Sequence, residues 1–285
     1  MKKIFYSLVV LLSLFFLWIR ADFQNGDGLG PEDGAPKREI LKFALVADSE
    51  NDNENLEKAL ESAKSLGATF VIGLGDWTQL GLSKDLLVAK QIFDNAGLEY
   101  YVTVGDRDLW DSRNRGLDAK NGFNAVFGKT SHIINREGIQ IVILDNGDIY
   151  KGIDSNTWQM LNKSLDDCDG GLLNKSNVKS QRSKLCFVFA HKTPFHPQSS
   201  HIMGADSNEV AFQAREFMAL MEQAKVDGFF SGDLHFFAQF QSPANIVKIT
   251  TIGAVDADRN FQGSRFATVT VYSDYSWEVE DIEIR

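Results

Sequence analysis

Five short segments of the chain each follow an apolar run and carry acidic or histidine side chains that can bind a metal ion. The segments read LVADSE, VIGLGDW, VTVGDRD, VFAHKTP and FFSGDLH. Ligand sites of open α/β sheets gather at the carboxyl ends of strands, so we expect the five segments to converge on one site. The candidate metal ligands are Asp48, Glu50, Asp76, Asp106, His191, Asp233 and His235.

Glycine directly precedes Asp76 and Asp106. It has no side chain, so it allows a tight turn and a close approach of the backbone to an ion. A single Gly-Asp pair is also an ordinary turn sequence, and His191 and His235 could be core histidines that end apolar runs. The occurrence of all five segments in one chain favours a two-metal hydrolase.

The order of the segments resembles the calcineurin-like metallophosphoesterase superfamily, whose blocks read DxH or DxG, GDxx, GNHD, a lone His, and GHxH. Here the blocks stand as DSE, GDWTQ, GDRD, AHKTPF and GDLH, and the resemblance extends from about Leu41 to the C-terminus. It implies an α/β fold, the four-layer α/β/β/α sandwich. It also implies two divalent ions bridged by Asp76 and hydrolysis of phosphate mono- or diesters by metal-activated water.

Three of the metal positions depart from the family pattern. Glu50 and Asp233 stand where many members have histidine, and Asp106 stands where they have asparagine. Oxygen ligands favour manganese, iron, magnesium or calcium over zinc. A centre of five carboxylates and two divalent ions has a net negative charge. Either Arg107 and Lys192 offset this charge, Glu50 points elsewhere, one ion is trivalent, or phosphate turnover is weak.

Arg107 and His201 are the candidate catalytic residues outside the metal set. Arg107 replaces the GNHD histidine, and a guanidinium can contact phosphate but cannot lose a proton near neutral pH. The run AHKTPFHPQSSH, which ends at His201, is similar to the purple acid phosphatase branch, and this similarity implies that His201 approaches the phosphate. His201 is therefore either a replacement acid or a polar loop histidine. Gln79 occupies the place of that branch's metal-binding tyrosine, so an iron-tyrosinate centre is not expected.

The apolar pattern predicts the elements that position these loops. Segments 41–47, 69–74 and 99–104 read as buried strands separated by helices at 56–66 and 84–96, which is the alternation of a parallel sheet. Later segments predict a hairpin around Glu137-Gly138, two more helices and a strand-rich final third. The predicted hairpin strands are 131–135 and 140–144, the helices 154–165 and 209–224, and the final strands 235–241, 246–252, 266–272 and 277–284.

The composition fits one elaborated domain over 40–285. At 285 residues and 44% hydrophobic content the chain can bury a large core. Its net charge of −10 argues against a nucleic-acid-binding surface, because phosphate backbones require clustered Lys and Arg. The resemblance implies a small phosphate ester as the partner. A non-catalytic member of the family that binds an ion or an envelope partner is the alternative.

The N-terminus predicts export. Lys2 and Lys3 precede an apolar run over 4–19, so residues 1–20 read as a signal peptide or signal anchor and 21–39 as a flexible linker. The run is short for a membrane-spanning helix, but no cleavage site is clear and no cysteine marks a lipid anchor. We expect attachment to the membrane through this segment, or secretion to the periplasm or beyond.

Cys168 and Cys186 bracket a polar loop. A disulfide between them would stabilise the fold by about 3 kcal/mol in the loop-entropy model. Cys186 also opens an apolar strand-like run, so a buried free thiol is the alternative.

Overall fold

The computed structural model describes residues 37–169 and 183–285, which contain two β-sheets. The first sheet has the order β11-β10-β1-β2-β3, and the second has the order β4-β5-β6-β7-β9-β8. The strands of the first sheet are β1 (Glu39–Val46), β2 (Phe70–Gly73), β3 (Glu99–Val102), β10 (Arg265–Tyr272) and β11 (Trp277–Glu283). Those of the second are β4 (His132–Arg136), β5 (Ile139–Ile143), β6 (Leu185–Ala190), β7 (Gly228–Ser231), β8 (Ala238–Gln241) and β9 (Lys248–Thr251).

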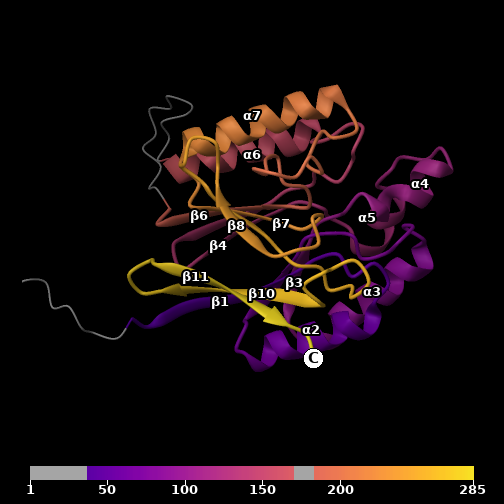
Figure 1. The fold of residues 1–285 in the computed structure, drawn as a ribbon, viewed down its shortest axis with the longest axis horizontal. Helices are drawn as coiled ribbons and strands as arrows, with labels where there is room; N and C mark the ends of the chain where they lie inside the picture. The colour runs from indigo at the N-terminus through magenta and orange to yellow at the C-terminus, as the bar shows by residue number, and fades with distance from the viewer. Residues whose placement is uncertain (1–36, 170–182) are drawn as a thin grey trace, which may run out of the picture. The chain divides into compact units, whose positions relative to one another are not determined.

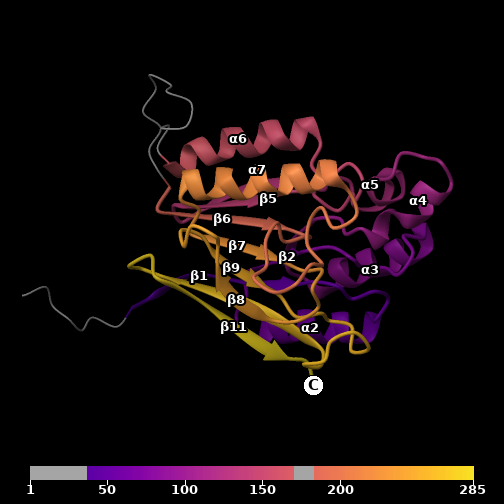
Figure 2. The same cartoon turned by 45° about the horizontal axis from the view of Figure 1, so that its top comes forward.

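Helices cover the outer face of each sheet, as Figures 1 and 2 show. The helices α2 (Asn53–Ser65) and α3 (Ser83–Ala96) pack on the first sheet, and α6 (Ser155–Asp169) and α7 (Asn208–Ala224) pack on the second. A third apolar cluster fills the space between the two sheets. The predicted four-layer α/β/β/α sandwich is therefore confirmed.

Aromatic side chains dominate the layer between the sheets. Phe43 of β1 stacks on Phe70 of β2 with ring centroids 5.0 Å apart, and Phe189 of β6 stacks on Phe230 of β7 at 4.8 Å. Phe43 also meets Phe189 edge to face at 6.0 Å, which joins the two sheets. Such pairs add to the burial of large apolar surfaces.

Strand direction brings the functional loops together. In the first sheet β1, β2 and β3 are mutually parallel, and in the second β5, β6, β7 and β9 are parallel. The loops that leave the carboxyl ends of neighbouring parallel strands emerge at the same edge. The βαβ alternation expected for the first sheet is confirmed, with β10 and β11 added as antiparallel strands.

Local signals set the helix limits. Helix α2 begins after Asp52, whose side chain accepts a hydrogen bond from the Asn55 backbone N–H at 3.1 Å. Helix α3 ends at Gly97, which has the left-handed φ of 66° that glycine adopts readily. The Glu137-Gly138 hairpin is also confirmed, and both residues have positive φ.

The structure corrects the predicted elements at a strand limit and in a loop region. The strand predicted over 235–241 begins only at Ala238, because His235 adopts a left-handed turn. The loop-rich region after β3 contains a 3-10 helix, η1 (Arg107–Leu109), and two short helices, α4 (Trp110–Asn114) and α5 (Asn121–Phe127). These helices are too short to show a helical period in the sequence.

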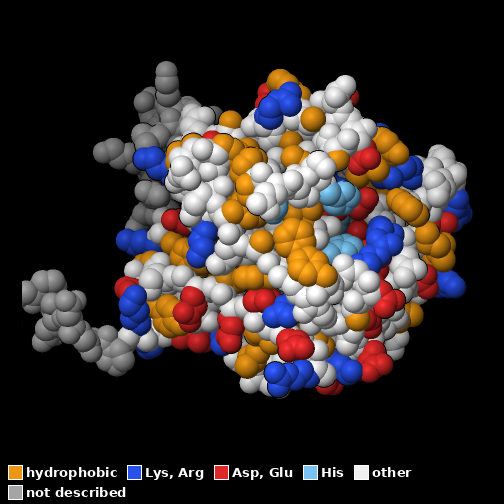
Figure 3. All heavy atoms as spheres, in the orientation of Figure 1, with side chains coloured by type: hydrophobic (Ala, Val, Ile, Leu, Met, Phe, Trp, Pro, Cys, Tyr) orange, Lys and Arg blue, Asp and Glu red, His pale blue; other side chains and the backbone are white. Residues whose placement is uncertain are grey.

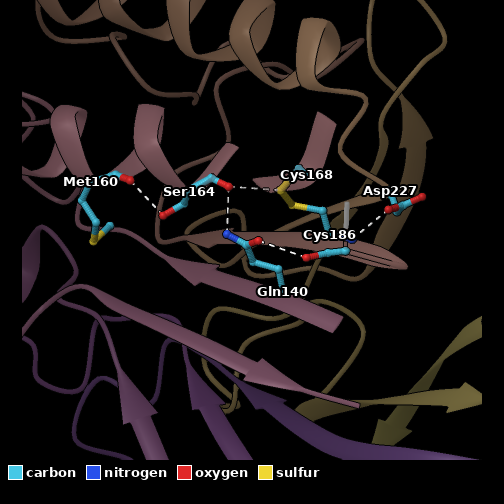
Figure 4. The surroundings of a disulfide bond; sticks show 7 residues. Gln140, Met160, Ser164, Cys168, Cys186 and Asp227 are labelled. Carbon is cyan, nitrogen blue, oxygen red and sulfur yellow. Dashed lines mark hydrogen bonds between the residues drawn. A yellow bond between two sulfur atoms is a disulfide. The ribbon is translucent and has the colours of Figure 1, made fainter. Parts of the chain in front are cut away.

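Cys168 and Cys186 form a disulfide with Cα atoms 5.6 Å apart, so the free-thiol alternative is wrong. Figure 4 shows that the bond joins α6 to the beginning of β6. Nearby, the Gln140 side-chain amide donates to the Ser164 carbonyl at 2.8 Å.

The predicted export segment over 1–20 and most of the 21–39 linker lie outside the described residues. Within 37–169 and 183–285, no helix is long and apolar enough to cross a membrane.

Candidate metal centre

The loops after five strands bring most of the predicted ligands into contact. The first donor group consists of Asp48, Asp76 and His191, and the second consists of Asp106, His191 and Asp233. Within each group the potential ligand atoms lie within 4.8 Å of one another. The five residues leave β1, β2, β3, β6 and β7, so residues distant in sequence meet at one edge of the two sheets.

The backbone of these loops is strained where it presents the ligands. Five of the seven predicted ligands have φ in the left-handed region, which costs a non-glycine residue roughly 1–2 kcal/mol. Such conformations persist where the surrounding structure fixes them, and they cluster at functional sites. The residues and their φ angles are Asp48 (54°), Glu50 (41°), Asp76 (56°), Asp233 (64°) and His235 (63°).

Glycines allow the loops to cross closely. A Cβ at Gly105 would lie 2.0 Å from Asp76 Oδ1, and one at Gly232 would lie 2.9 Å from Asp48 Oδ2. A Cβ at Gly75, which has a φ of 96°, would lie 2.6 Å from the Gly105 nitrogen. The Gly-Asp pairs of the sequence are therefore required by the packing of the loops.

His191 is fixed with one ring nitrogen toward the carboxylates. Its Nδ1 lies 2.8 Å from the Leu74 carbonyl oxygen, which can only accept, so Nδ1 carries the hydrogen. Its Nε2 lies 3.4 Å from Asp106 Oδ1 and 3.6 Å from an oxygen of both Asp76 and Asp233. Burial opposes protonation, but Asp76 and Asp106 raise the pKa of His191 well above its usual value.

The first donor group contains carboxylates with little charge compensation. Burial raises the pKa of Asp48 to about 8 and also raises that of Asp76, although His191 acts against both shifts. Asp48 accepts the Asp233 backbone N–H at 3.0 Å, and Asp76 accepts the Arg107 backbone N–H at 3.0 Å. These oxygens are therefore held in place, but no lysine or arginine among the described residues contacts them as closely as Lys192 contacts Asp233.

The second donor group is compensated by Lys192. The Lys192 ammonium donates to Asp233 and lies 3.7 Å from Asp106 Oδ1. Burial acts to raise the pKa of both acids, but His191 and Lys192 lower that of Asp106 to about 2, and Lys192 and His201 lower that of Asp233. These carboxylates stay ionised at neutral pH without a metal.

Glu50 and His235 reach the site but lie outside both donor groups. Glu50 is buried between two guanidinium groups, with Oε1 3.0 Å from Arg107 Nε and Oε2 3.3 Å from Arg259 Nε. His235 Nε2 lies 3.4 Å from Glu50 Oε1 and 4.0 Å from Asp48 Oδ1. Burial lowers the pKa of His235 to about 4, so the ring is neutral near pH 7 and can act as a ligand.

The two predicted catalytic residues border a cavity of 310 Å³ beside the donor groups. His201 Nε2 lies 3.4 Å from Asp233 Oδ1, and its side chain is 63% exposed. The contact with Asp233 raises the pKa of His201. Figure 3 shows histidine side chains close together on one face, next to acidic and basic ones. The cavity is lined by Asp76, Asp106, Arg107, His201, Asp233, Leu234, His235 and Arg259.

Sequence reasoning missed three residues that shape the site. Buried Asp108 accepts the backbone N–H of Gly105 at 3.1 Å and of Thr78 at 3.0 Å, which ties the second and third loops together. Asp108 could have been found from the sequence, because it is the second aspartate of the GDRD segment. Asn146 and Arg259 stand in no recognised segment, and only their contacts across the fold reveal them.

Comparisons with known proteins give the fold but not the sequence family. No family model matches the chain, and no curated protein matches it. Among solved structures, a dimetal phosphatase from Danio rerio is similar with a TM-score of 0.58 and 14% identity, over 86% of this chain and 99% of that one. The chain has the calcineurin-like metallophosphoesterase fold.

Two other similar structures differ in their described roles. A purple acid phosphatase from yellow lupin gives a TM-score of 0.60 at 12% identity, over 86% of this chain and 52% of that one. GAP50, the anchor in the inner membrane complex of Plasmodium, gives 0.55 at 13% identity, over 87% and 90%. The fold alone therefore does not decide between an enzyme and an anchor.

Proposed function

We propose that the chain is a metal-dependent phosphoesterase that hydrolyses small phosphate esters. One observation carries the proposal: members of both donor groups line one cavity together with Arg107, Arg259 and His201. Metal ligands, anion-binding guanidinium groups and a titratable acid thus meet in one place. This combination is what hydrolysis of a phosphate ester requires.

The donor groups fit divalent ions. Each group offers carboxylate oxygens and an imidazole nitrogen, and this set favours manganese, iron, magnesium or calcium over zinc. Among the described residues, Asp233 Oδ2 is buried without a hydrogen-bond partner. An unsatisfied buried oxygen of this kind is stabilised by a bound cation. The resemblance implies two ions, and Asp76 would be one of the residues that hold them.

When bound, such ions would polarise the phosphoryl group and lower the pKa of a bound water. The side chains of the chain supply binding and charge. Arg107 and Arg259 border the cavity, where their guanidinium groups can hold the phosphate anion. Neither residue delivers a proton near neutral pH.

His201 is the proton donor in this proposal. The His201 side chain borders the cavity, and its Nε2 contacts Asp233 Oδ1. This contact favours the protonated imidazole ring. A protonated histidine can deliver its proton to the leaving-group oxygen, which Arg107 cannot do. His201 thereby takes the role that the family's GNHD histidine would have.

The test is hydrolysis of a panel of phosphate monoesters and diesters by the purified protein with manganese. We expect turnover that EDTA abolishes and manganese restores. A protein that binds manganese but hydrolyses no ester in the panel would overturn the proposal. It would favour the second candidate function, a non-catalytic protein that binds an ion or an envelope partner.

A specific contact supports that second candidate. Arg107, which replaces the family histidine, is engaged by Glu50 at 3.0 Å and Asp76 at 3.7 Å rather than being free to meet a substrate. The similarity to GAP50 shows that this fold also occurs in a protein described as an anchor.

We also propose that the protein is exported and either anchored in the membrane or secreted. The apolar run after Lys2 and Lys3 supports this proposal, and so does the Cys168–Cys186 disulfide, because such bonds persist in oxidising compartments. Deleting residues 1–37 should release a folded protein from the membrane fraction. Loss of folding in that variant would overturn the assignment of the segment.

A further inference from the structure

We propose that the Lys192 ammonium takes the place of the second metal ion, so that the centre holds one divalent ion in the first donor group. The inference rests on the proposed function for the presence of a metal centre. It concerns only the number of ions and the residue that replaces one of them.

Lys192 contacts the same two carboxylates that would bind the second ion. Its Nζ donates to Asp233 Oδ1 and lies 3.7 Å from Asp106 Oδ1. An ion on these oxygens would lie a few ångströms from the ammonium. Repulsion between like charges at that distance is strong where water is excluded.

The position of Lys192 is built into the fold. The Asn146 side chain accepts the Lys192 backbone N–H at 2.9 Å and donates to the Lys192 carbonyl at 2.7 Å. Lys192 is only 4% exposed. Burying an ammonium is costly unless it is paired, so the lysine belongs with these carboxylates.

Within the described part of the chain, the first donor group has no permanently charged cation in a position equivalent to that of Lys192. Among the described residues, the only nitrogens of basic side chains within ion-pair distance of Asp48 belong to histidines, at 3.9 Å for His191 and 4.0 Å for His235. Asp76 has Arg107 Nε at 3.7 Å, but that guanidinium lies closer to Glu50. The first group therefore depends on a bound ion, whereas in the second group the Lys192 ammonium already pairs with the Asp233 carboxylate through Oδ1 and leaves only Oδ2 unsatisfied.

The charge balance of the site points to the same number. Three permanent cations contact four of the five carboxylates, all but Asp48. The five carboxylates and three cations together have a formal excess of two negative charges, which one divalent ion cancels. A second ion would make the centre positive by two charges. The carboxylates are Asp48, Glu50, Asp76, Asp106 and Asp233, and the cations are Arg107, Lys192 and Arg259.

The test is the metal content of the full-length protein after loading with manganese and gel filtration. We expect one ion per chain, with the electron paramagnetic resonance spectrum of an isolated Mn(II). Lys192→Met should raise the content to two ions and give the spectrum of a spin-coupled pair. Lys192→Arg, which keeps the charge, should stay at one ion.

Two ions per wild-type chain, or none, would overturn the inference whether or not Lys192→Met folds. A folded Lys192→Met variant that stays at one ion would also overturn it. Ester hydrolysis measured on the same samples separates this inference from the proposed function. One ion without turnover keeps the inference and overturns the function, and two ions with turnover does the reverse.

Discussion

The two donor groups share His191 but differ in what balances their carboxylates. In the first group Asp48 and Asp76 are buried with weak compensation, and burial raises the pKa of both. In the second group Asp106 and Asp233 face Lys192, and the pKa of both is lowered despite burial. The aspartates of the two groups are chemically alike, yet their pKa values shift in opposite directions. The presence or absence of a lysine beside them decides the direction.

The largest effect is expected at Asp76, which has His191 at 3.6 Å and belongs to the group in which we propose a bound ion. Asp76→Asn should remove bound metal and lower turnover by ~1,000-fold, about 4 kcal/mol in the barrier. Metal content and kcat/KM measure both effects. Glu216→Gln on the exposed face of α7 is the matched control. An Asp76→Asn variant with full metal content would show that the first group is misassigned.

Lys192→Met should destabilise the metal-free protein by about 3 kcal/mol, because removing one partner of a buried pair leaves an uncompensated charge. Lys90→Met, which breaks the exposed pair with Asp94 at 2.6 Å, should cost under about 1 kcal/mol. Urea unfolding in EDTA measures both variants. Equal effects of the two substitutions would contradict the compensating role of Lys192.

His201→Gln should lower kcat by ~100-fold for esters with poor leaving groups, because general acid catalysis contributes on this scale. Esters with acidic aryl leaving groups should lose little, since they need no proton. The pH dependence of kcat between acidic and neutral pH should change as well, because the titrating imidazole has been removed. An equal loss for both kinds of ester would assign His201 to binding alone.

Without metal, the protein should lose stability as the pH rises from 6.5 to 8. In this range the folded chain retains protons on Asp48 and His191, whose raised pKa values exceed the unfolded values of 3.8 and 6.5. Each retained proton contributes a slope of about 1.4 kcal/mol per pH unit.

Asp76 and His201, whose pKa values are also raised, act in the same direction, whereas two other groups of the site do not contribute in this pH window. His235 titrates between its folded pKa of about 4 and 6.5, and Asp106, with a pKa of about 2, is ionised throughout. Manganese should flatten the slope, because a bound ion replaces the protons of the first group. Urea unfolding at several pH values, with EDTA or manganese, tests this. A flat profile in EDTA would contradict the difference between the two groups.

The sequence by itself determined where the ligands lie along the chain and which sheets carry them. The buried runs before Asp48, Asp76 and His191 are local features, and the carboxyl ends of parallel strands meet wherever such strands pair. For that reason the parallel alternation of the first sheet and the convergence of the predicted ligands could be derived from the pattern of apolar residues, whereas the four-layer sandwich followed from the resemblance to a known family.

Only the tertiary structure decided which cation each carboxylate meets. Lys192 follows His191 directly, yet its contact with Asp233 depends on Asn146 holding its backbone from 46 positions away. Arg259 reaches Glu50 from the distant loop before β10, where no motif marks it. Electrostatic compensation depends on distances of a few ångströms between distant segments. Sequence spacing does not encode those distances, whereas it does encode the period of strands and helices.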